Sequence, residues 1–145
     1  GTSPTLQELA DVQLAAGEYA AAKQTHERVL AIYEKTIGPE DADLAYPLTG
    51  IGRAQLGLGE PAAAIGPLER AVSLRAPKQL APGLLADSRF ALAQALWDTN
   101  GDRPRARRLA EEARQEFARL ARERELVVLT EEPTEGALRV EQVAP

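Results

Sequence analysis

The sequence predicts an all-α fold in which three helical hairpins stack side by side. Three observations support this: an apolar content dominated by Ala and Leu, a glycine–acid pair at a fixed interval, and apolar residues spaced three and four apart around each pair. Hydrophobic residues make up 44% of the 145 residues, but aromatic residues only 4%. Ala and Leu are the strongest helix formers, whereas a β-sandwich would need β-branched and aromatic residues.

Each predicted hairpin is centred on a glycine followed by an acidic residue. The pairs are Gly17-Glu18, Gly59-Glu60 and Gly101-Asp102, which recur at 42-residue intervals. A glycine tolerates the left-handed conformation that ends a helix, and an acid is favoured at the start of the next helix. We therefore expect an array over residues 1–125, with hairpins at about 4–37, 43–76 and 84–125.

Both helices of each predicted hairpin carry an apolar stripe. The first helices have Leu6, Leu9, Ala10 and Leu14, then Leu48, Ile51, Gly52 and Leu56, then Leu92, Ala93 and Leu96, with one extra residue before the third glycine. The second helices have Ala22, His26 and Val29, then Ala64, Leu68 and Ala71, then Ala106, Leu109 and Ala113. Small residues recur at matching places in these stripes, so we expect the paired helices to approach closely.

Two places depart from the repeat. Pro67 lies inside the second helix of the second repeat and predicts a kink there. Residues 126–145 fit no repeat, and Leu126–Thr130 has a composition that favours a β-strand. Three interpretations of this tail stay open: a cap on the last hairpin, an acidic linker, or a segment that docks into a groove of its own or a neighbouring chain.

The repeat resembles the tetratricopeptide repeat, in which a Leu-Gly pair, a turn Gly, a Tyr and two Ala mark fixed places. Leu9-Ala10, Gly17, Tyr19 and Ala22 match them in the first repeat, and Ile51-Gly52, Gly59, Ala64 and Ala71 in the second. The long second helix through Val29–Lys35 is similar to the 42-residue kinesin-light-chain subclass. The stretch Leu92–Trp97, followed by Gly101-Asp102-Arg103, resembles the C-terminal arrays of large bacterial serine/threonine kinases.

The resemblance implies a right-handed α-solenoid of about three such hairpins plus a C-terminal tail or cap. It also implies a concave face, lined by the first helices, that binds an extended peptide or a partner helix. The residues expected to project into it are Gln7, Asp11, Leu14, Thr49, Arg53, Phe90, Gln94 and Trp97. For Trp97 a packing role, and for Arg53 an ion pair, are the competing interpretations. Family members that hold a C-terminal carboxylate carry Lys and Asn on this face, so that binding mode is not expected here.

Catalytic and metal chemistry have little support in the sequence. His26 is the only histidine and there is no cysteine, so neither a catalytic dyad nor a zinc site can be assembled from these residue types. His26 is interpreted as a residue packed between helices. The acids Glu40, Asp41 and Asp43 lack the spacing of a calcium loop and are interpreted as a helix cap. We therefore expect no enzyme activity, no cofactor and no metal.

The charge pattern restricts the class of partner. The net charge of −5 gives no reason to expect nucleic acid. No apolar run approaches the roughly 18 residues of a membrane span and no signal peptide is evident, so a cytoplasmic location without membrane binding is expected. Arg and Glu alternate after Arg103 at spacings of three and four, which predicts an ion-paired helix face; its most basic patch is 103–108.

The leading hypothesis is a scaffold that binds a protein or peptide partner, as a module of a larger signalling protein. The start at Gly1-Thr2-Ser3 suggests a fragment of a longer chain. The alternative is a structural module that forms a homodimer through its array ends or its tail.

Overall fold

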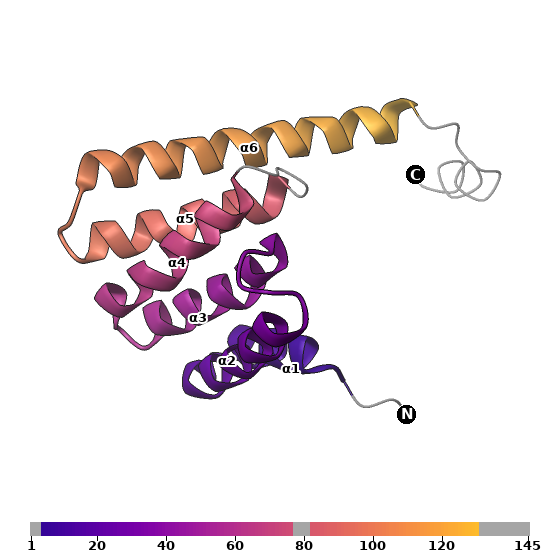
Figure 1. Ribbon diagram of the computed structural model, residues 1–145. Helices are drawn as coiled ribbons and strands as arrows, with labels where there is room; N and C mark the ends of the chain where they lie inside the picture. The colour runs from indigo at the N-terminus through magenta and orange to yellow at the C-terminus, as the bar shows by residue number, and fades with distance from the viewer. Residues whose placement is uncertain (1–3, 77–81, 131–145) are drawn as a thin grey trace.

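The computed structural model describes residues 4–76 and 82–130, and every regular element in these ranges is helical. The helices form three consecutive hairpins: α1 (Leu6–Ala15) with α2 (Tyr19–Thr36), α3 (Ala45–Gly57) with α4 (Pro61–Arg75), and α5 (Pro82–Asp98) with α6 (Arg103–Thr130). A single 3-10 turn, η1 (Ala42–Leu44), precedes α3. Each hairpin packs against the next, so the array grows in one direction (Figure 1). The predicted all-α solenoid of three hairpins is confirmed.

Side-chain caps define where several helices begin. Thr5 and Glu8 form a reciprocal capping box at α1, with Glu8 N–H donating to Thr5 Oγ1 at 3.1 Å. Asp102 accepts from the Arg105 backbone N–H at 3.0 Å at the start of α6. Asp41 accepts from the Asp43 backbone N–H at 2.9 Å at η1, which confirms that the acids around residue 41 include a helix cap.

The hairpin turns depend on one left-handed residue each. Gly17 and Gly59 have φ of +79° and +76°, as expected for glycines that end a helix. In the third turn this residue is Asn100, with φ of +55°, so the expectation for Gly101 was wrong. Asparagine visits this conformation more readily than most residues. Gly101 instead donates its N–H to Leu96 O at 3.0 Å. The first residue of α6 still lies 42 residues after the first residue of α4.

The small residues of the stripes lie where helices cross, as predicted. Ala10, Ala22 and Ala64 are fully buried. A methyl group on Gly52 would fall well inside van der Waals contact with Leu68 of the paired helix α4. The largest cluster of buried residues lies between the second and third hairpins and includes Leu68 and Leu92. The core therefore runs along the array between consecutive hairpins.

The last helix is longer than the repeat requires. Residues 126–130 are helical as the end of α6, although their composition favours a strand. A strand needs a neighbouring strand for its backbone hydrogen bonds, whereas a helix satisfies them locally, and α6 is already formed. The predicted array boundary at residue 125 therefore falls inside a helix. The remaining tail, 131–145, lies outside the described residues. Pro67 does not end α4, which continues to Arg75.

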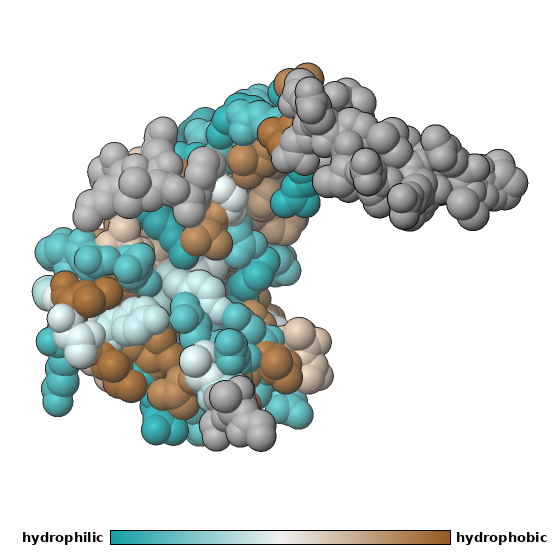
Figure 2. Space-filling view, turned by 90° about the vertical axis from the view of Figure 1, so that its right-hand side faces the viewer, coloured by the Kyte–Doolittle hydropathy of each residue, from teal (hydrophilic) through white to brown (hydrophobic). Residues whose placement is uncertain are grey.

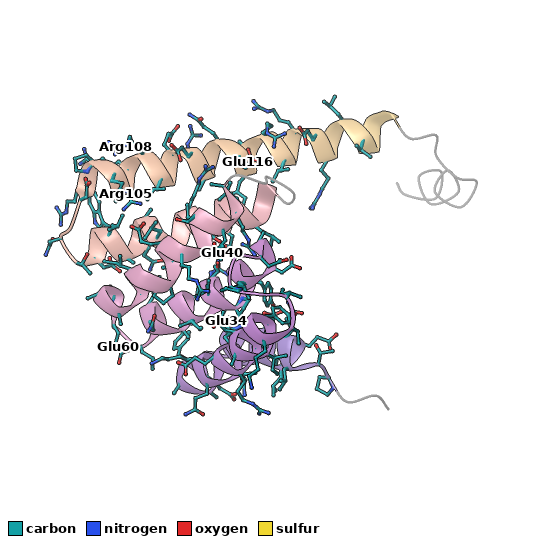
Figure 3. All side chains as sticks on the ribbon, in the orientation of Figure 1. Glu34, Glu40, Glu60, Arg105, Arg108 and Glu116 are labelled. Carbon is teal, nitrogen blue, oxygen red and sulfur yellow. The ribbon has the colours of Figure 1, made fainter. Side chains whose placement is uncertain are left out.

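Ion pairs repeat along the outer side of the array. Arg70 of α4 donates to Glu34 of α2 at 3.1 Å, and Arg105 of α6 pairs with Glu69 of α4 through two N–H groups. Figure 3 labels Glu34 and Arg105, one member of each pair. Both pairs join consecutive second helices. Their side chains are more than a third exposed, so each contributes little stability. Along α6 itself, Arg119 pairs with Glu116 and Glu123, which confirms the predicted ion-paired face.

Candidate functional site

A groove of about 560 Å³ crosses the first helices of all three hairpins. It is lined by Asp11, Leu14 and Ala15 of α1, Tyr19 of α2, Arg53, Leu56 and Gly57 of α3, and Gln94 of α5. We call it the concave groove, because the array is curved and Figure 2 shows a hollow between its two ends. The lining includes both apolar and polar side chains, so the groove offers both apolar contacts and hydrogen-bonding groups.

Arg53 lies in the middle of this groove, held by an acid from the next hairpin. Its Nη2 donates to Asp87 Oδ1 of α5 at 2.5 Å, and 43% of the Arg53 side chain is exposed. The ion-pair interpretation of Arg53 is therefore confirmed. Because a guanidinium carries five N–H donors, the pair leaves other donors of this groove-lining residue available.

A smaller polar cavity of about 60 Å³ lies beneath the concave groove. Asp11, Leu14 and Arg53 line both spaces, so the two are adjacent. The remaining lining residues are His26, Tyr46, Thr49, Gly50, Arg75, Leu84 and Asp87. This cavity brings together polar side chains from all three hairpins.

His26 lies at the inner wall of the polar cavity and is only 1% exposed. Its ring meets the Tyr46 ring edge-on, with centroids 5.9 Å apart, which confirms the packing interpretation. Neither ring nitrogen has a hydrogen-bond partner. Burial lowers the pKa of His26 below 6.5, and the charge of Asp11 opposes this only in part. The neutral imidazole is therefore the form that the fold accommodates.

We expect the array to lose stability as the pH falls below about 6.5, where an unfolded histidine begins to bind a proton. Between the folded and unfolded pKa values the unfolded chain holds more protons, so the free energy of unfolding decreases by up to about 1.4 kcal/mol per pH unit. Urea denaturation between pH 5.5 and 7.5 measures this slope. Because His26 is the only histidine, His26→Leu should remove it. An unchanged slope in that variant would assign the effect to other groups.

The predicted binding residues fall into three groups: residues of the concave groove, residues between helices, and the pair Phe90 and Trp97 described below. Asp11, Leu14, Arg53 and Gln94 line the concave groove. Thr49 is 4% exposed and its Oγ1 lies 2.7 Å from Ser88 Oγ, so it joins two helices. Gln7 is half-buried, and its Oε1 accepts from the Tyr33 hydroxyl at 3.4 Å. The structure therefore places the last two between helices.

Four residues of the groove wall were not among the expected binding residues: Ala15, Tyr19, Leu56 and Gly57. Leu56 and Gly57 lie three and four residues after Arg53, which places them on the same helix face. The helical spacing could have identified them, but Leu56 was assigned to the apolar stripe between helices. Tyr19 enters from α2, and no spacing rule within the first helices points to it.

Phe90 and Trp97 line a second groove of about 360 Å³ between α5 and α6, which we call the end groove; Gln94 is the lining residue that it shares with the concave groove. Its lining residues are Phe90, Ala93, Gln94, Trp97 and Asp98 of α5, and Ala106, Arg107 and Ala110 of α6. Phe90 is 51% exposed and Trp97 41%. The guanidinium carbons of Arg103 and Arg107 lie 4.5 and 5.6 Å from the Trp97 ring centroid, so a cation–π stack orients this side chain.

Neither a metal-ligand cluster nor a helix suited to a membrane is found in the described ranges, 4–76 and 82–130. No group of three or more His, Asp or Glu side chains there is arranged to hold a metal ion. No helix in the same ranges is both long enough and apolar enough to cross a membrane.

Comparisons with known proteins agree with this architecture. A family model described as "Tetratricopeptide repeat" matches residues 2–76. Two solved structures of kinesin light chain TPR-like repeats from Podosopora anserina, one of them a single-substitution variant, are 28% identical to this chain with a TM-score of 0.61. The match covers 74% of this chain and 51% of theirs, so this chain spans about half their length. No curated protein matches significantly. The resemblance to kinesin-light-chain repeats is confirmed.

Proposed function

Because this chain belongs to the tetratricopeptide repeat family, whose repeats generally mediate protein–protein interactions, we propose that its concave groove binds an extended peptide of a partner protein. The observation that carries the proposal is one continuous groove across α1, α3 and α5. Neighbouring helices lie about 10 Å apart, so three of them span about 20 Å. An extended chain covers that distance with about six residues.

The side chains in the groove suggest what the peptide should carry. Leu14 and Leu56 supply apolar surface from two neighbouring hairpins, which favours an apolar anchor side chain in the peptide. Asp11, Arg53 and Gln94 supply an acceptor, donors and an amide for the peptide main chain or for flanking polar residues. We therefore expect a short motif with one apolar anchor and polar neighbours.

Substitution of Arg53 tests this proposal. A library of displayed ten-residue peptides would be selected on the chain, and the best peptide titrated by fluorescence polarisation. We expect Arg53→Ala to weaken binding by about tenfold or more, because a central arginine is a frequent hot spot. Arg89→Ala is the matched control: Arg89 is a first-helix arginine paired with Glu112 at 3.5 Å and does not line the groove.

Trp97→Ala distinguishes the two grooves. Because Trp97 lines the end groove and not the concave groove, this variant should leave peptide affinity within about twofold. Loss of binding in Trp97→Ala with none in Arg53→Ala would place the peptide in the end groove instead and contradict the proposal.

We also propose that the array is a module of a larger cytoplasmic signalling protein from a bacterium. The support is the resemblance of Leu92–Trp97 and Gly101–Arg103 to the C-terminal arrays of bacterial serine/threonine kinases. The sequence of the parent protein tests it, with a kinase domain upstream as the expected result.

A further inference from the structure

We propose that the two ends of the array bind each other, so that α1 of one copy occupies the end groove of a second copy and the chains associate head to tail. This inference is independent of the proposed peptide binding, because it rests on the end groove and on the exposed face of α1. Its support comes from the internal repeat, which already shows how such a groove receives such a helix.

The groove that precedes the end groove in the array is occupied. Leu56, Ile65 and Leu68 of the second hairpin pack in one cluster with residues of α5, including Leu92 and Ala95. Repeat positions are aligned on the left-handed turn residue for the first helices and on the first residue of the helix for the second helices. In this alignment Leu56, Ile65 and Leu68 correspond to three residues of the third hairpin. These are Trp97, Arg107 and Ala110, and all three line the end groove. The end groove is therefore the open counterpart of the surface that holds α5.

A second correspondence supports the same assignment. Thr49 of α3 faces the next hairpin, because its Oγ1 lies 2.7 Å from Ser88 Oγ of α5. The residue at the same position in the third hairpin is Phe90, which is 51% exposed at the end groove. The same repeat position therefore contacts the following helix in the second hairpin and holds a half-exposed aromatic ring in the third.

The opposite end of the array presents a helix of the required kind. Ile51 and Ala54 of α3 are 5% and 0% exposed. Ala54 lies on the same helix face as Gly50 and Gly57, where an added methyl group would meet His26 and Tyr19 of the preceding hairpin. The positions of Ile51 and Ala54 are held in α1 by Leu9 and Val12, which are 38% and 65% exposed. Because α1 keeps the apolar residues of a packing face without burying them, its face matches the one that α5 inserts.

Charge complementarity favours α1 as the occupant. Helix α1 carries the exposed Glu8 near its start and has no basic residue. The end groove is bordered by Arg103 and Arg107, and its lining contains one carboxylate, Asp98. In the repeat register Glu8 corresponds to Gly50, which lies against His26, and His26 corresponds to Ala110 of the groove. If α1 of a second copy packs on the third hairpin as α3 packs on the first, its Glu8 lies beside Ala110, one helical turn from Arg107.

An interface between two different ends does not close on itself at two copies. Each added copy leaves one free groove and one free α1, so the association is open-ended and increases with concentration. This distinguishes it from a symmetric homodimer, in which the same patch meets itself and growth stops at two.

Sedimentation velocity of the 145-residue chain over a concentration series tests the proposal first. We expect the average mass to rise past that of a dimer. Trp97 is the only tryptophan and lines the end groove, so its fluorescence should shift over the same concentration range. A constant monomer mass, or a mass that stops at the dimer, would overturn head-to-tail association.

Two variants that each block one end make the test specific. Val12→Arg blocks α1 and Phe90→Arg blocks the groove; both residues are more than half exposed, so the fold should be retained, as thermal melting by circular dichroism would verify. Each variant alone should be monomeric. Their equimolar mixture has one compatible pair of ends and should form a 1:1 dimer and nothing larger.

Leu58→Arg is the control, because Leu58 is 41% exposed at the tip of the middle hairpin, away from both ends. It should associate as the unmodified chain does. The proposal is wrong if the mixture of blocked variants stays monomeric, if either blocked variant still self-associates, or if Leu58→Arg prevents association as well.

Discussion

Replacing Leu68 with alanine is expected to lower the free energy of unfolding by about 2–5 kcal/mol. Leu68 is fully buried and belongs to the cluster that joins the second and third hairpins. Its loss removes apolar contacts and leaves a cavity, because the rigid helices around it cannot close the space. Urea denaturation followed by circular dichroism measures the change. Leu58→Ala, at a 41% exposed leucine, should change it by no more than about 0.5 kcal/mol.

Gly52 supplies a second test of the same contact. Gly52→Ala alone should destabilise the array by about 1–3 kcal/mol, because the added methyl group would overlap Leu68. In the Leu68→Ala background that space is free, and Gly52→Ala should become neutral or stabilising by up to about 1 kcal/mol, since alanine is the better helix former. Additive effects of the two substitutions would show that this close approach does not control the packing.

The fold could be predicted from the sequence because each repeat carries its own turn residues and its own apolar residues at helical spacing. Gly17 and Gly59 end their helices as expected, and the small residues such as Gly52 lie at the crossings. The third turn was misassigned because the extra residue of that hairpin lies in the turn, after the left-handed position, which is therefore held by Asn100 and not by Gly101. The strand propensity of 126–130 was overridden because those residues continue a helix that is already formed.

The candidate site was less predictable, for a physical reason. Helical spacing shows which face a residue occupies, but not whether another hairpin covers it. Thr49 and Phe90 hold the same position in their repeats, yet Thr49 is buried under α5 while Phe90 is exposed in the end groove. The eight expected residues therefore divided between a groove, a helix interface and the array end. Arg75 gave no signal, because nothing in its sequence context indicates a buried arginine.

Helix α5 is held to the second hairpin by a buried polar network centred on Ser88, which is fully buried. Ser88 Oγ accepts from Arg75 Nη1 of α4 at 2.9 Å and lies 2.7 Å from Thr49 Oγ1 of α3. Arg75 Nη1 also donates to Leu84 O at 2.7 Å. Burial lowers the pKa of Arg75, but a guanidinium stays charged at any physiological pH. Arg75, which is only 8% exposed, thus joins α4 to α5, and Ser88 extends the network to α3.

Arg75→Ala is expected to lower the free energy of unfolding by about 2–4 kcal/mol. The variant loses two hydrogen bonds from a charged donor and the packing of the aliphatic stem. These losses outweigh the gain from no longer having to remove a charged group from water. Arg75→Met keeps an aliphatic stem but has no N–H donors. It should recover less than half of the lost free energy of unfolding, because the Leu84 carbonyl still lacks the hydrogen bond that Arg75 donated. Urea denaturation and hydrogen exchange at α5 measure the two effects.

Arg70→Ala is the matched control, since Arg70 lies on the same helix in a pair with Glu34 whose side chains are 39% and 40% exposed. Its cost should stay below about 1 kcal/mol, as for other exposed ion pairs. Full recovery in Arg75→Met would mean that the stem alone fastens α5. Equal losses in Arg70→Ala and Arg75→Ala would mean that burial adds nothing to the Arg75 contacts. The result expected here, a large difference between two arginines five residues apart, follows from their environments, because one is partly exposed to solvent and the other is buried where α4 meets α5.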